Sequence, residues 1–162
     1  MQLWAILQSV FILAFANGAP VIAAKIFGRR FEQPVDCGVK LRDGRALFGP
    51  SKTIRGVLLS IAVSAAGAPL VGVPPETGAA MGCAAMAGDL FSSFLKRRLG
   101  YEPSSRATGI DQVPESLFPL LVARQTIGLT VMDIAAAVAV FFVGEILLSR
   151  LLYKWHIRDQ PY

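Results

Sequence analysis

Asp89 is an acidic residue inside an otherwise apolar run that extends from residue 77 to 95. A carboxylate at the centre of a membrane span costs about 2.5–3.5 kcal/mol on insertion scales, so it usually faces a polar cavity and marks function. On a helix, Asp89 shares one face with Ser92 or Ser93 and with Lys96. This face combines a candidate metal ligand, a hydroxyl and a cation suited to phosphate. It predicts a site for a phosphorylated substrate at the membrane surface.

Two more acidic residues, Asp111 and Glu115, stand at the start of a later apolar segment. Their spacing of four residues puts them on one helical face. Asp111 is either the N-cap of that helix or a second metal ligand facing Asp89 across the bundle. Two carboxylates, a hydroxyl and several cations suit phosphoryl or nucleotidyl transfer, which depends on Mg²⁺, positioning and charge neutralisation. We therefore expect Mg²⁺ as cofactor, with Asp89, Asp111 and Glu115 as its candidate ligands.

A polar cluster of Ser51, Lys52, Thr53 and Arg55 opens the second apolar segment. The start of a helix offers free N–H groups and a partial positive charge, so a phosphate can bind there. Lys52 and Arg55 add charge, and Ser51 or Thr53 can cap the helix. The alternative for the basic residues is a role in topology and in contact with lipid headgroups.

Other polar residues have two interpretations each. Asp36 and Asp43 either cap turns and pair with charges, or position a substrate-binding arginine or contact metal. Asn17, inside the first apolar run, is a candidate substrate contact, with an interhelical hydrogen bond as the alternative. For Arg124 and Asp133 we expect a structural ion pair with each other near the outer surface.

The composition indicates an integral membrane protein. The chain has 162 residues, 54% of them hydrophobic and 17% charged, whereas soluble domains carry about 25% charged residues. Residues 1–24 and 56–75 contain no charge, and each run reaches or exceeds the ~20 residues that are needed to cross a bilayer. We predict an all-α polytopic protein that forms a single domain, 1–162. Its five transmembrane helices are expected at about 3–25, 55–74, 77–96, 112–129 and 131–152.

Basic residues predict the orientation of these spans. Eight lie in the first loop and its flanks, four around the third loop and three in the tail. These 15 are expected on one side of the membrane, and Arg124 is the one basic residue expected on the other side. By the positive-inside rule the N-terminus is outside, and the C-terminus and the site face the cytoplasm. The charge is explained by topology and anionic lipids, and without an aromatic-rich basic patch we expect no nucleic-acid partner.

Several ordered motifs resemble the CDP-archaeol synthase family, which is related to the CDP-diacylglycerol synthases (phosphatidate cytidylyltransferases). They run in order from Ala16 to Gln112. The motifs are Ala16-Asn17, Pro34-Val35-Asp36-x-Gly38, Asp43-Gly44-Arg45, Gly49-x-Ser51-Lys52-Thr53-x-Arg55-Gly56, Gly88-Asp89, Ser93-Phe94-x-Lys96-Arg97-Arg98 and Asp111-Gln112.

The resemblance implies a CTP-dependent, Mg²⁺-dependent cytidylyltransferase in phospholipid biosynthesis. A lipid phosphate, either phosphatidate or an archaeal ether-lipid phosphate, would attack the α-phosphorus of CTP and give CDP-lipid and pyrophosphate. Catalytic roles would fall on Asp89, Lys96 and Asp111. Substrate binding would involve Asn17, Asp36, Asp43, Ser51, Lys52, Thr53, Arg55, Ser93, Arg97 and Arg98.

The chain departs from the family pattern at Pro114. The family usually has a second acid three residues after the first, as in Asp-Gln-Leu-Asp, and here Glu115 follows Pro114 instead. Glu115 either substitutes for that acid or belongs to an altered metal site. The alternatives to the cytidylyltransferase are another nucleotidyl or phosphoryl transferase acting on a lipid phosphate, and a non-catalytic membrane scaffold. The sequence leaves a homo-oligomer open.

Overall fold

A computed structural model of the chain describes residues 1–28, 30–103, 105 and 107–154, with side chains up to residue 150. The basic residues Arg29, Arg106 and Arg158, which count in the charge distribution above, lie outside the described residues. The helices are α1 (Leu3–Phe27), α2 (Ile54–Gly67), the short 3-10 helix η1 (Ala68–Val71), α3 (Pro75–Arg98), α4 (Gln112–Ile127) and α5 (Val131–Lys154). The predicted all-helical fold is confirmed, and each predicted span matches one helix, the second being α2 with η1.

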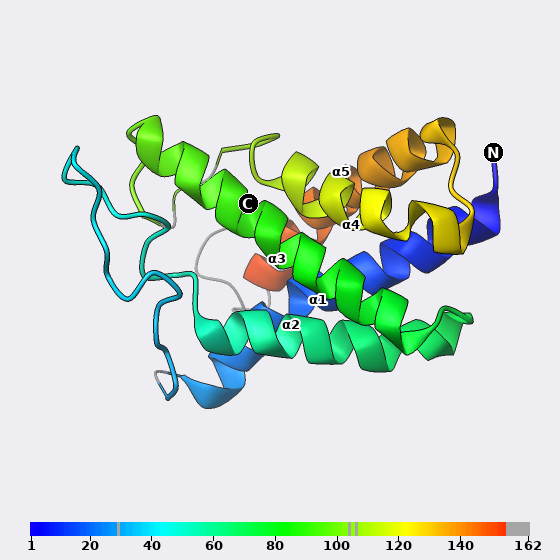
Figure 1. Cartoon of the computed structure of the whole chain (residues 1–162), viewed down its shortest axis with the longest axis horizontal. Helices are drawn as coiled ribbons and strands as arrows, with labels where there is room; N and C mark the ends of the chain where they lie inside the picture. Colours follow the sequence, from blue (N-terminus) through cyan, green and yellow to red (C-terminus); the bar gives the residue numbers. More distant parts are fainter. Residues whose placement is uncertain (29, 104, 106, 155–162) are drawn as a thin grey trace.

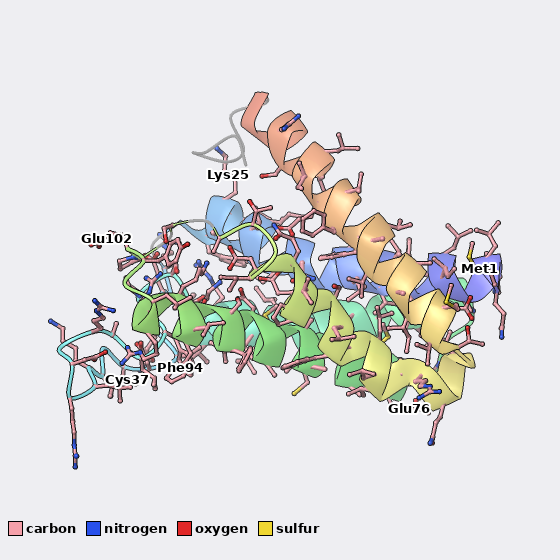
Figure 2. The ribbon with its side chains drawn as sticks, turned by 90° about the horizontal axis from the view of Figure 1, so that it is seen from above. Met1, Lys25, Cys37, Glu76, Phe94 and Glu102 are labelled. Carbon is pink, nitrogen blue, oxygen red and sulfur yellow. The ribbon has the colours of Figure 1, made fainter. Side chains whose placement is uncertain are left out.

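The five long helices form a bundle with the connecting segments at its two ends (Figure 1). The long first loop and the turn after α3 lie at one end, and the N-terminus lies at the other. In Figure 2 this separates Cys37, Phe94 and Glu102 from Met1 and Glu76. The residues predicted to carry chemistry therefore gather at the end that holds the first and third loops.

Among the residues that the structure describes, four helical segments are long and apolar enough to cross a membrane: Leu3–Phe27, Ile54–Val71, Pro75–Arg98 and Val131–Arg150. The helix α4 has 16 residues, or about 24 Å at 1.5 Å per residue, whereas the hydrocarbon core is about 30 Å thick. The predicted fourth span, 112–129, is thus a helix two residues shorter than expected. It packs inside the bundle, with Leu120 and Ala123 fully buried.

Small residues allow α2 and α3 to approach closely. A Cβ added at Gly78 would lie 2.4 Å from the carbonyl oxygen of Ser64, and one at Gly82 would lie 2.9 Å from that of Ser60. Such contacts leave no space for a side chain, so glycine is required at both positions. Close packing of small residues is a common way to join helices in a membrane, where the lipid removes most of the hydrophobic driving force.

The predicted ion pair between Arg124 and Asp133 is wrong. Asp133 accepts hydrogen bonds from the backbone N–H and the hydroxyl of Thr130, at 3.1 and 2.7 Å, and from the backbone N–H of Gln2 at 2.8 Å. Thr130 in turn accepts from the N–H of Asp133. This reciprocal pattern is a capping box. It satisfies the carboxylate without Arg124, whose Nε donates to the carbonyl oxygen of Leu129.

Candidate active site

A cleft of about 480 Å³ opens between α1, the start of α2 and the middle of α3. Helix α1 contributes Asn17 and Lys25 to its polar lining, and the turn before α2 contributes Ser51, Lys52 and Thr53. Asp89, Glu115 and Glu145 come from α3, α4 and α5. Apolar side chains, including Val21, Val57, Met86 and Leu90, line the rest. A cleft of this size with a few convergent charged groups is typical of a ligand site.

Lys52, Asp89 and Glu115 form the charged centre of the cleft. The Nζ of Lys52 lies 2.5 Å from Oδ1 of Asp89, and the two side chains are 22% and 18% exposed. The carboxyl groups of Asp89 and Glu115 are in hydrogen-bonding contact. Although burial lowers the pKa of Lys52, the carboxylates of Asp89, Glu115 and Asp111 outweigh it and raise that pKa above its usual value. Lys52 is therefore a cation at neutral pH.

The contact between Asp89 and Glu115 depends on a close approach of α3 and α4 one residue earlier on each helix. A Cβ at Gly88 would lie 2.3 Å from the carbonyl oxygen of Pro114. Because position 88 has no side chain, the two backbones touch there, and the next residue on each helix carries its carboxyl group to the same place. Pro114 lies in the first turn of α4, where the missing N–H costs no helical hydrogen bond.

Lys96 and Asp111 form a second ion pair beside the cleft, with Nζ 2.6 Å from Oδ1. Lys96 also donates to the carbonyl oxygen of Ser105 at 3.0 Å. Asp111 occupies the N-cap position of α4 without a capping hydrogen bond from its side chain. Its Oδ2 accepts instead from the N–H of Ala107 at 3.1 Å. The pair thus ties the third loop to the end of α3.

The first loop positions Lys52 through backbone hydrogen bonds to Asp36. Oδ2 of Asp36 accepts from the N–H groups of Phe48 and Gly49, both at 2.9 Å, and Oδ1 accepts from Gly38 at 3.0 Å. Burial raises the pKa of Asp36, but these N–H donors outweigh it and hold the pKa below its usual value. Gly49 then accepts from the N–H of Lys52. Asp36 therefore acts as the turn cap that the sequence offered as one alternative.

The same loop is held against the C-terminal end of α3. Nη1 of Arg98 donates to both carboxylate oxygens of Asp43, at 2.9 and 2.8 Å. Nη1 of Arg45 donates to the carbonyl oxygens of Arg97 and Arg98, where the helix dipole favours a cation. Arg97 is buried, and its Nη2 donates to the carbonyl oxygen of Glu102. Asp43, Arg97 and Arg98 thus organise the loops beside the cleft.

Four other predicted residues divide between the cleft and its surroundings. The hydroxyl of Thr53 accepts from the N–H of Gly56 and caps α2, as the sequence predicted for Ser51 or Thr53. Asn17 lines the cleft, and its amide donates to the carbonyl oxygen of Leu13 in the same helix, rather than across helices. Ser93 is buried. Arg55 donates to the carbonyl oxygens of Gly28 and Arg30, away from the lining.

The donor groups suit a hard cation that also binds phosphate. Mg²⁺ is usually held by one or two carboxylates together with substrate phosphates and water. Asp89 and Glu115 supply two carboxyl groups in contact, and such a pair either shares a proton or holds a cation. Within the described ranges no three Asp, Glu, His or Cys side chains gather as a metal-ligand set. Asp111, paired with Lys96, therefore stands apart from the other two predicted ligands, and its ligation stays a prediction.

Sequence reasoning missed two charged residues of the cleft. Lys25 is one of the eight basic residues of the first loop and its flanks, and Glu145 has no predicted role in the site, yet both line the cleft. The rule that intramembrane ionisable residues mark function applies to Glu145 as it does to Asp89. For Lys25 no local sequence signal distinguishes it from its basic neighbours.

The chain is similar to proteins named CDP-archaeol synthases. The family model described as CarS-like, CDP-archaeol synthase, matches residues 75–162. A CDP-archaeol synthase of Aeropyrum pernix is 38% identical over 127 residues, covering 73% of this chain and 70% of the relative. One of Pyrobaculum calidifontis is 30% identical over 156 residues, covering 91% and 90%. One of Methanopyrus kandleri is 36% identical, and the match spans 65% of that longer protein.

A solved structure has the same fold. It is described as an intramembrane enzyme for archaeal membrane lipids biosynthesis. The TM-score is 0.71 at 31% sequence identity, and the match covers 85% of this chain and 90% of that one. The helical bundle described above is therefore shared with an enzyme that works inside a membrane.

Proposed function

The chain belongs to the CDP-archaeol synthase family, and on that premise we propose that it transfers the cytidylyl group of CTP to a lipid phosphate. An oxygen of the lipid phosphate forms a bond to the α-phosphorus of CTP, the bond to the β-phosphate oxygen breaks, and pyrophosphate leaves. The observation that carries this proposal is the triad of Lys52, Asp89 and Glu115 in a cleft at the loop end of the bundle.

Each charged group has a role that suits this reaction. Lys52 and the hydroxyl of Ser51 bind phosphate oxygens of the nucleotide, because both line the cleft at the start of α2. Lys96 is close enough to Asp89 for its charge to act on that carboxylate, and it neutralises charge on the pyrophosphate. The acceptor is an ionised phosphate, so the reaction needs no strong general base. Positioning and electrostatic stabilisation provide the catalysis.

We propose Mg²⁺ as the cofactor, held by Asp89 and Glu115. When bound, it would neutralise the negative charge of the nucleotide's phosphate groups. Glu115 then takes the place of the acid that the family pattern has at the position of Pro114. The contact of the Glu115 and Asp89 carboxyl groups supports this assignment.

For the acceptor we propose an archaeal ether-lipid phosphate, since the relatives are named CDP-archaeol synthases. The cleft combines charged groups with the apolar side chains of Val21, Val57, Met86 and Leu90, which suits a substrate with a charged head and hydrocarbon chains. We further propose that the loop end faces the cytoplasm, where CTP is available. The basic residues of the first and third loops support this orientation.

The test is an assay of purified protein in detergent with CTP, Mg²⁺ and either phosphatidate or an ether-linked archaeal lipid phosphate. We expect CDP-lipid from the wild type, a preference for the ether lipid, and a loss of at least about a hundredfold in Asp89→Asn. Lys40→Gln, in the exposed part of the first loop, serves as the control and should keep full turnover.

Four results would contradict part of this proposal. A faster reaction with phosphatidate would correct the acceptor. CTP binding without a product from either lipid would favour a transferase for another lipid phosphate. Full turnover by Asp89→Asn, or no CTP binding by the wild type, would overturn the assignment of the site.

A further inference from the structure

Lys52 and Lys96, the two lysines assigned to phosphate groups, are each paired with a carboxylate. Lys52 lies 2.5 Å from Asp89, and Lys96 lies 2.6 Å from Asp111. All four side chains are 22% exposed or less, so water screens these charges only partly. Asp89 and Asp111, which suit a cation, therefore neutralise Lys52 and Lys96, which suit phosphate.

A metal ion arriving alone meets an obstacle at Asp89. It must displace the ammonium group of Lys52 from the carboxylate and leave that cation beside the new one, in a half-buried cleft. A like charge at this distance is unfavourable, and an unpaired buried charge is costly. A triphosphate arriving alone has the opposite difficulty. If it takes Lys52, Asp89 loses its ion-pair partner and stands with Glu115 next to the phosphate oxygens.

Arrival of both ligands removes both costs. The metal ion binds the carboxyl groups of Asp89 and Glu115, and the phosphate oxygens pair with Lys52. Asp89 and Lys52 then each keep a partner of opposite charge. We infer that Lys52 holds the place of the metal ion on Asp89, so that divalent cation and nucleotide triphosphate bind with positive coupling and each binds weakly without the other. This inference rests on the proposed function for the identity of the nucleotide, whereas the exchange of partners at Asp89 rests on the geometry.

The inference predicts that removing either member of the pair strengthens binding of one ligand alone. For the metal arm, Mn²⁺ without nucleotide is titrated into detergent-purified full-length protein, and free Mn²⁺ is followed by its electron paramagnetic resonance signal. We expect Lys52→Gln to bind Mn²⁺ about tenfold more tightly than the wild type, within the usual range of coupling between ligands. Lys40→Gln removes a charge from the exposed part of the same loop and should match the wild type.

For the nucleotide arm, binding of radiolabelled CTP is measured in EDTA. Asp89→Asn frees Lys52, so we expect it to bind metal-free CTP several-fold more tightly than the wild type. Glu76→Gln, at the far end of the same helix (Figure 2), is the matched control and should leave CTP binding unchanged. A merely structural ion pair predicts the opposite, because breaking it would loosen the cleft and weaken both ligands.

The two arms decide the inference independently of turnover. Weaker or equal Mn²⁺ binding by Lys52→Gln would overturn it, and so would weaker or equal CTP binding by Asp89→Asn in EDTA. If one variant does not fold, the other arm remains decisive. A wild type that binds Mn²⁺ and CTP as expected but forms no CDP-lipid would refute the proposed function and leave the exchange intact.

Discussion

The backbone of Gly88 in α3 lies directly against the carbonyl group of Pro114 in α4, so closely that a Cβ at position 88 would be 2.3 Å from that oxygen. This contact fixes the register of the two helices beside the cleft. It brings Asp89 and Glu115 together. The acid that the family pattern has at position 114 stands at position 115 in this chain, and from there it still reaches Asp89 on α3.

Replacing Gly88 with alanine should therefore damage both stability and activity. The added methyl group overlaps backbone atoms that cannot move independently of the helix, so we expect a loss of about 1–3 kcal/mol in unfolding free energy and a strong fall in turnover. Thermal unfolding in detergent and the CDP-lipid assay measure the two effects. Gly18→Ala is the control, because a Cβ there has nothing within 4 Å. Equal stability of both variants would show that α3 and α4 do not touch at this point.

Glu115 should be essential as an acid and sensitive to the reach of its side chain. We expect Glu115→Gln to lower turnover on the order of a hundredfold and to raise the Mg²⁺ concentration required for half-maximal rate. Glu115→Asp should recover part of the activity, because the carboxyl group is retained at a shorter reach. Glu76→Gln, at the opposite end of the bundle, should be active. A fully active Glu115→Gln would mean that the acid lost at position 114 has no replacement here.

Asp36 gives the first loop a defined dependence on pH. Its pKa is held below the usual value, because the N–H donors of Gly49, Phe48 and Gly38 outweigh the effect of burial. The stabilisation is therefore complete above the ordinary pKa of an aspartate and is lost as pH falls through the lower pKa of the folded state. We expect Asp36→Asn to be less stable than the wild type at pH 7, with the difference shrinking below about pH 4.

The measurement for Asp36 is a series of thermal unfolding curves for both proteins between neutral and acidic pH. Because Asp36 reaches the cleft only through the turn that carries Lys52, the variant should also bind CTP more weakly at neutral pH. A stability difference that stays constant down to the most acidic point would show that the carboxylate charge is not what the N–H donors stabilise.

Asp133 should matter for stability and not for the reaction. Its carboxylate caps α5 and accepts from the N–H of Gln2, at the end of the bundle opposite the cleft. We expect Asp133→Ala to lose about 1–2 kcal/mol of stability with normal turnover per folded molecule. Arg124→Gln should have little effect on unfolding, because Arg124 makes no ion pair with Asp133. Equal destabilisation by both variants would restore the pairing that the sequence predicted.

The sequence by itself determined the helices and the most informative position. Charge-free runs of nearly bilayer length specify membrane spans, because the free energy of burying charge in lipid depends mainly on composition along the chain. The same argument identified Asp89, which the structure places in the cleft. The helix cap was also predictable from the sequence. A hydroxyl residue directly before an apolar segment is a common N-cap, and Thr53 caps α2 in this way.

Only the tertiary structure decided which charged groups meet. The sequence left two alternatives for Asp36, a turn cap or a metal or substrate contact, and in the fold its oxygens accept from backbone N–H groups of the first loop. It predicted an ion pair between Asp133 and Arg124, yet the carboxylate of Asp133 accepts hydrogen bonds from Thr130 and Gln2. It identified Lys52 and Asp89 as separate candidates, 37 residues apart, and only the fold shows that they form an ion pair. Such contacts depend on the register between helices and on where a loop folds back. That register is set by close contacts between helices, as at Gly88 and Pro114. The periodicity of apolar residues along the chain does not predict such contacts.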